Sequence, residues 1–142
     1  MGSVGHVDAP MKNMLVVSKT CDAGRIQSSP LPHGCFVVTG KGEDPGFNLA
    51  ITRLLEIGCE FFATWGDYSD AEEIIDDLIL DAGDMDAVTI SLNESLEDAV
   101  EFFAHGAFPG LNCVRFVLLI CQDAPDSLML KAISLFEKEL NL

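Results

Sequence analysis

Three segments of the sequence carry side chains that could bind a small ligand, and each follows an apolar, strand-like run. Thr39-Gly40-Lys41 follows the first run, Trp65-Gly66-Asp67-Tyr68 the second and Asn93 the third. Open α/β sheets bind ligands outside the carboxyl ends of their strands, where aromatic rings stack on a ligand or anchor a partner. The alternative is that Trp65 closes the end of the core. The candidate ligand pocket consists of Thr39, Gly40, Lys41, Trp65, Asp67, Tyr68 and Asn93.

Gly40-Lys41-Gly42 resembles a phosphate-binding loop only superficially. A Walker loop has a hydroxyl residue directly after its lysine, and here glycine and two acids follow. Those acids, Glu43 and Asp44, also occupy the place that an anion would take at a helix N-terminus. We therefore predict that Asp44 is a helix N-cap, with Pro45 at the first helical position.

The acidic and nucleophilic residues do not form a pattern typical of a catalytic or metal site. Adjacent Asp76 and Asp77 diverge by about 100° on a helix, so they would not converge on a metal ion. His33 and His105 have no spacing to a cysteine or serine that indicates nucleophilic catalysis. We predict no catalytic residues, no metal and no resident cofactor; enzymatic activity stays open, with a non-enzymatic role favoured.

The elements that would position these residues alternate regularly. Apolar runs at 35–39, 59–64, 87–91 and 115–121 predict strands, a run at 14–18 predicts a possible edge strand, and a helical pattern follows each of the four main runs. Ser69 with Glu72 predicts a capping box, and Ser95 predicts another helix start. The fold class is a single doubly wound, three-layer α/β domain over 14–142, after a flexible tail at 1–13. Its mainly parallel sheet has four or five strands.

The order of the four main strands is predicted as 2-1-3-4. Right-handed crossovers in strict sequence would place every connecting helix on one face, so the winding must reverse once. This order places the helices after the second and third runs side by side on one face of the sheet. It would therefore join their outer surfaces.

Charge is the most unusual property of the composition. The 142 residues include 23 acids and 8 bases, a net charge of −15, and no lysine or arginine lies between Leu54 and Val114. Such a surface repels nucleic-acid backbones and anionic membranes but complements a basic protein. We predict an immunity protein or inhibitor that binds a basic toxin or nuclease. The predicted partner-binding residues are Asp70, Glu73, Asp77, Asp81, Glu97 and Glu101.

Two resemblances add alternatives. Ala63-Thr64-Trp65-Gly66-Asp67 resembles the second flavin-binding loop of flavodoxins, in which a tryptophan flanks the flavin ring. That likeness covers about fifteen residues and implies a flavin- or nucleotide-binding module, with FMN as the cofactor. From Leu54 to about residue 120, the chain is similar to a group of uncharacterised small bacterial α/β domains, in Leu55-Glu56-x-Gly58-Cys59 and in Trp65-Gly66 before an acidic helix.

The cysteines and the first residues indicate a cellular compartment. Five cysteines without a CxxC pair are typical of free thiols in a reducing cytoplasm. Residues 1–10 lack the basic start and apolar stretch of a secretory signal. With the bacterial resemblance, these features predict a cytoplasmic protein.

Overall fold

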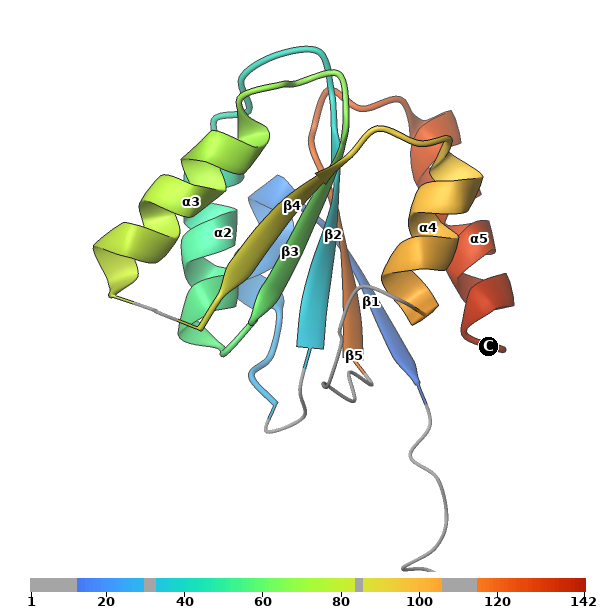
Figure 1. Ribbon diagram of the computed structural model, residues 1–142, viewed down its shortest axis with the longest axis horizontal. Coiled ribbons are helices and arrows are strands. Elements are labelled where there is room, and N and C mark those ends of the chain that lie inside the picture. Colours follow the sequence, from blue (N-terminus) through green and yellow to red (C-terminus); the bar gives the residue numbers. More distant parts are fainter. Residues whose placement is uncertain (1–12, 30–32, 84–85, 106–114) are drawn as a thin grey trace, which may run out of the picture.

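The computed structural model describes residues 13–29, 33–83, 86–105 and 115–142, and these form a parallel sheet with helices on both faces (Figure 1). The strands are β1 (Met14–Lys19), β2 (His33–Thr39), β3 (Phe61–Gly66), β4 (Val88–Leu92) and β5 (Arg115–Ile120). The helices are the 3-10 helix η1 (Thr20–Arg25), α2 (Phe47–Glu56), α3 (Ala71–Ala82), α4 (Leu96–His105) and α5 (Asp126–Glu139). The predicted three-layer α/β fold is confirmed, including the edge strand β1. Of the predicted tail at 1–13, residues 1–12 lie outside the described residues.

The predicted strand order is wrong. It placed β4 inside the sheet and β5 at an edge, whereas the observed order is β1-β5-β2-β3-β4. Burial explains the difference, because β5 is buried along its whole length and β4 is mostly exposed or half-buried. A strand such as β5, which is apolar at every position after Arg115, is stabilised by two neighbours and two covered faces. A short strand with partly polar side chains tolerates the edge.

This order changes which helices are neighbours. The chain winds in one direction from β2 through α2, β3 and α3 to β4, so α2 and α3 cover the same face, together with η1 (Figure 1). The connection through α4 then returns across the sheet to β5, and α4 packs beside α5 on the opposite face. The predicted neighbours α3 and α4 therefore lie on opposite faces of the sheet.

Strand β2 supplies side chains to both cores because successive side chains of a strand point to opposite faces. Cys35 and Val37 join the core under α2 and α3, whereas Phe36 and Val38 join the core under α4 and α5. The second core contains a cluster of phenylalanine rings, among them Phe36, which packs edge-on against a ring from α4 and a ring from α5. The two layers of helices thus rest on two separate cores, and β2 contributes to both.

Of the three predicted helix caps, the structure confirms one and contradicts two. Ser95 accepts a hydrogen bond from the Asp98 N–H at 3.2 Å, as predicted. The predicted capping box of Ser69 is wrong, because α3 begins after Asp70, whose side chain makes no capping bond. Helix α2 begins after Gly46, two positions later than predicted. Asp44 binds the Gly46 N–H but lies outside the helix.

Candidate binding surface

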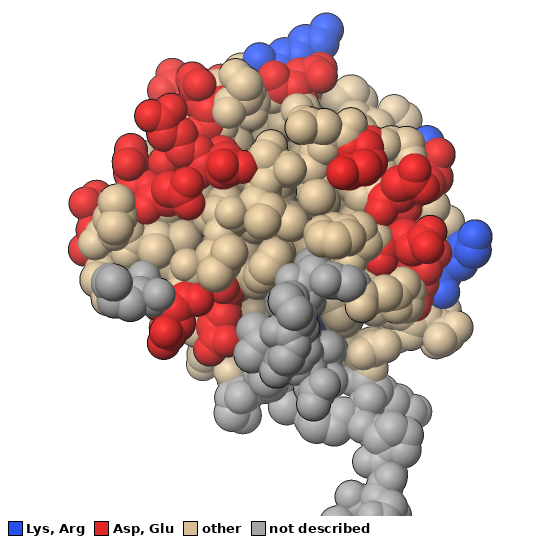
Figure 2. Space-filling view, in the orientation of Figure 1, with Lys and Arg blue, Asp and Glu red and all other residues tan. Residues whose placement is uncertain are grey.

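The outer side of α3 carries a cluster of carboxylates without counterions. Its inner side chains, such as Ile75, are buried against the sheet, so the helical period turns the acids outward. None of these acids forms an ion pair with another residue in the described part of the chain. Figure 2 shows them as a broad acidic region over α3. We call this surface the α3 acidic face; it consists of Asp70, Glu72, Glu73, Asp76, Asp77 and Asp81.

The acids of α4 form a separate group. Glu97 and Glu101 are exposed on the other helical layer, so the predicted joint surface with α3 does not exist. Glu97 is also compensated, because Lys131 Nζ lies 2.7 Å from its carboxylate and lowers its pKa through their hydrogen bond. In Figure 2 the two acidic regions are separated by uncharged side chains. Of the predicted partner-binding residues, only the four on and before α3 lie together.

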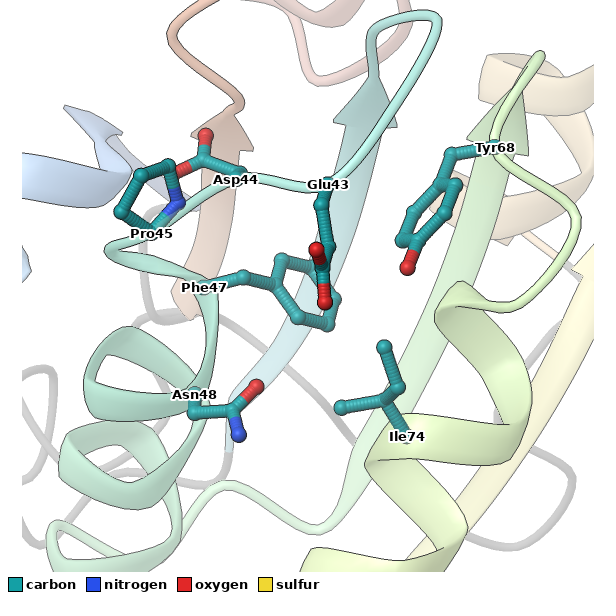
Figure 3. A pocket seen from close by; sticks show the side chains of 7 residues that line it. All are labelled: Glu43, Asp44, Pro45, Phe47, Asn48, Tyr68 and Ile74. Atoms are coloured by element: carbon teal, nitrogen blue, oxygen red, sulfur yellow. The ribbon is translucent and has the colours of Figure 1, made fainter.

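The true neighbour of α3 is α2, and two hollows lie along their seam. The first, of about 400 Å³, lies near the carboxyl ends of β2 and β3 and is lined by Glu43, Phe47 and Tyr68 among others (Figure 3). The second, of about 420 Å³, lies farther along and includes Glu56 and Asp81. Both combine carboxylates with apolar side chains. The α3 acidic face therefore continues towards α2 into surfaces that complement basic, partly apolar groups.

The structure divides the predicted ligand pocket. Thr39, Trp65, Asp67 and Asn93 line a hollow of about 240 Å³ at the carboxyl ends of the strands. Tyr68 instead lines the first α2–α3 hollow. The remaining two residues, Gly40 and Lys41, belong to a loop that contacts the segment after β5. Only four of the seven residues thus share one site.

Trp65 serves as part of the core as well as of the hollow. Its ring is half-buried against the core under α4 and α5, and its Nε1–H donates a 2.8 Å hydrogen bond to the Glu94 carbonyl. The following Gly66 has φ +130°, and a Cβ there would collide with Thr39. The Trp-Gly pair is therefore explained by packing and by a tight backbone approach.

We expect Trp65→Ala to lower the free energy of unfolding by about 2 kcal/mol, less than the 3–5 kcal/mol typical of a fully buried aromatic ring, because this residue is only partly buried. Trp65→Phe keeps most of the packing and loses the indole hydrogen bond, so it should cost about 1 kcal/mol. Denaturant unfolding of both variants measures these values. An unchanged stability of Trp65→Ala would show that the ring does not support the core.

The crevice between β2 and β5 is filled by the chain's own carboxylates. The loops after these two strands lead to opposite faces of the sheet, which is where doubly wound proteins bind ligands. Here the Asp123 carboxylate accepts hydrogen bonds from the N–H groups of Lys41 and Gly42, at 3.0 and 3.3 Å. These amides are the donors that a phosphate-binding loop would offer. The occupied donors favour the prediction that Gly40-Lys41-Gly42 is not a phosphate loop.

Asp44 connects three segments from within the same crevice. Its carboxylate accepts hydrogen bonds from Thr20 Oγ1 at 2.9 Å, the Gly46 N–H at 2.9 Å and the Gln122 N–H at 2.7 Å. Only 8% of the residue is exposed. The sequence indicated a local cap, and it offered no signal for partners 24 and 78 residues away. Asp44 thus ties together the start of η1, the start of α2 and the segment that follows β5.

None of the four described cysteines forms a disulfide. Cys21 is exposed, whereas Cys35, Cys59 and Cys121 are buried. Burial, followed by the nearby carboxylate of Asp44, raises the pKa of Cys121 to about 12, and burial also raises the pKa of Cys35. These two thiols stay protonated at neutral pH and are poor nucleophiles. Cys113 lies outside the described residues.

Among the described residues, no three histidine, cysteine or acidic side chains are arranged to hold a metal ion. His105 contacts Glu139 at 2.9 Å. No helix of the described segments is long and apolar enough to cross a membrane.

The strand order also differs from that of flavodoxins, the flavin proteins that the segment around Trp65 resembles. Flavodoxins have the order 2-1-3-4-5, whereas the first strand here lies at an edge beside the last. The likeness to small bacterial α/β domains stays an expectation. Comparison of the chain with protein-family models, curated proteins and solved structures found no match.

Proposed function

We propose that this chain is a bacterial cytoplasmic interaction protein, an immunity protein or inhibitor, that binds a basic protein through the α3 acidic face. A toxin or a nuclease is the class of partner that such a surface suits. Complementary charge would speed the encounter and reject acidic or neutral competitors.

The observation that supports this proposal most is that no described residue acts as a counterion for the acids of α3. Glu73, Asp77 and Asp81 recur every four residues, so their like charges destabilise the isolated helix by a few tenths of a kcal/mol per pair. Helix α4 has an ion-paired acid, which shows that the same chain does compensate carboxylates elsewhere. An acidic surface left uncompensated is suited to pairing with charges supplied by a partner.

Paired charge reversals test the role of α3. The variant Glu73→Lys/Asp77→Lys changes the α3 acidic face, and the control Asp98→Lys/Glu101→Lys makes the same change in net charge on α4. A partner is first captured from a lysate of the source organism with the wild-type protein, and its association rate is then measured at low and high salt. We expect the α3 variant to associate at least tenfold more slowly at low salt, within the usual range of electrostatic steering, and the α4 control to lose much less.

Two further results are expected from these variants. The wild-type association rate should fall as salt rises, because salt screens the steering field. The α3 variant should also be slightly more stable to unfolding than wild type, because positions 73 and 77 keep like charges with each other but now attract the unchanged acids Asp70, Asp76 and Asp81. A partner whose association rate is equal in both variants would contradict docking at α3.

The strand-end hollow supports a second candidate, a small-ligand module that uses Trp65. Four of the seven predicted pocket residues line it. Its volume of about 240 Å³ is below the roughly 300–1,000 Å³ usual for ligand pockets, which favours a ligand smaller than FMN. An absorbance scan of the purified protein detects bound flavin directly. Quenching of Trp65 fluorescence by added FMN tests the same site without a preloaded cofactor.

A further inference from the structure

The first α2–α3 hollow combines polar acceptors with an apolar wall. Glu43 and Asn48 are exposed and come from the β2–α2 connection and the first turn of α2, and the half-buried Tyr68 follows β3. Figure 3 shows the side chains of these three residues directed into the gap between the two helices. Phe47, which is 2% exposed, and the half-buried Ile74 supply the apolar wall. The hollow can therefore accept an apolar stem that carries a polar head.

The electrostatic character of this hollow favours a cation. None of the residues that line it is basic. The pKa of Tyr68 is raised by partial burial and by the carboxylates of Glu43 and Asp70, so its hydroxyl stays protonated in a negative field. The α2 N-terminus would attract an anion, but Asp44 already binds the Gly46 N–H there at 2.9 Å. The side chain of Asp44 itself points away from the hollow (Figure 3).

We propose that this hollow binds the guanidinium group of one arginine side chain presented by the basic partner. Glu43, the Asn48 side-chain oxygen and the Tyr68 hydroxyl are acceptors that suit the five N–H donors of a guanidinium. The aliphatic stem packs on Phe47 and Ile74, which places the head among these acceptors. This inference rests on the proposed docking of a basic protein and adds a specific anchor to it.

A pair of peptides tests the anchor without the natural partner. Acetyl-Gly-Arg-Gly-amide carries the guanidinium, and the same peptide with citrulline in place of arginine keeps the shape but has no charge. Nuclear magnetic resonance titration of the full chain should give a dissociation constant about tenfold lower for the arginine peptide, as expected for a charge-assisted hydrogen bond. The shifts should concentrate on the Asn48 side-chain amide and the backbone amides of Gly46 and Tyr68.

Two single substitutions localise the binding. Glu43→Gln should raise the dissociation constant of the arginine peptide about tenfold, since it removes the carboxylate inside the hollow. Glu73→Gln is the matched control, because it removes one exposed acid of α3 that does not line the hollow. Both residues are exposed, so neither change should disturb the fold.

The outcomes separate this inference from the proposed function. Equal binding of the two peptides, or equal effects of Glu43→Gln and Glu73→Gln, would overturn the arginine anchor. Such a result would not affect the separate test of docking at α3, which uses the charge-reversal variants. Conversely, a partner insensitive to those reversals would overturn docking at α3, while selective binding of the arginine peptide would still support the hollow.

Discussion

Replacing Phe103 with alanine is expected to lower the free energy of unfolding by about 3–5 kcal/mol, the usual range for a fully buried aromatic ring. The Phe103 side chain is 0% exposed and is part of the core under α4 and α5. Its ring centre lies 5.4 Å from that of Phe36 on β2 and 6.2 Å from that of Phe136 on α5, with edge-on geometry in both cases. The substitution therefore removes both buried area and favourable ring contacts.

A double-mutant cycle turns this prediction into a test of the helix layers. Phe103→Ala and Phe136→Ala should couple by about 0.5–1.5 kcal/mol, because the two rings are in contact. Phe103→Ala and Ile75→Val should add within about 0.5 kcal/mol, because α3 and α4 lie on opposite faces of the sheet. Chemical denaturation of the single and double variants supplies these values. Coupling between positions 103 and 75 instead would favour the helix neighbours that the sequence predicted.

Replacing Asp44 with alanine is expected to lower the free energy of unfolding by about 3 kcal/mol, since one substitution removes the acceptor for three donors. The Thr20 hydroxyl and the N–H groups of Gly46 and Gln122 would each lose their bond to the carboxylate. Asp44→Asn retains the shape and one acceptor oxygen, so it should cost less than alanine.

Asp123 provides the matched control for this prediction. It lies in the same crevice and also accepts backbone hydrogen bonds, but it is exposed to solvent. Water can replace its contacts, so Asp123→Ala should cost only about 1 kcal/mol. Thermal and denaturant unfolding of both alanine variants distinguish the two. Equal losses would show that Asp44 does not tie the three segments together.

The proposed docking of a basic protein depends on the position of α2. The predicted order paired α3 with α4, which would have made a broad surface of acids alone. The observed order pairs α3 with α2 and creates the hollows in which Glu43, Glu56 and Asp81 lie beside apolar side chains. In the proposed docking, such a hollow would add selection by shape to selection by charge.

The sequence by itself determined the class of fold and the inward and outward sides of each element. Alternating apolar strands and amphipathic helices require a parallel sheet covered on both faces, whatever its strand order. The helical period alone places Ile75 and Ile79 inside and Glu73 and Asp77 outside. These features are local, so a single stretch of chain contains all the information they need.

Tertiary structure alone decided which surfaces meet. An amphipathic stripe shows that a helix is buried on one side, but it does not show which face of the sheet or which helix it contacts. Right-handed crossovers allow the winding to reverse after α2 or after α3, and the choice depends on the full burial of β5 against the exposure of β4. For the same reason, the bond from Gln122 to Asp44 was unpredictable, since local spacing carries no information about a partner 78 residues away. The acids of α3 were therefore predictable, and their separation from α4 and contact with the α2 hollows were not, because long-range packing determines both.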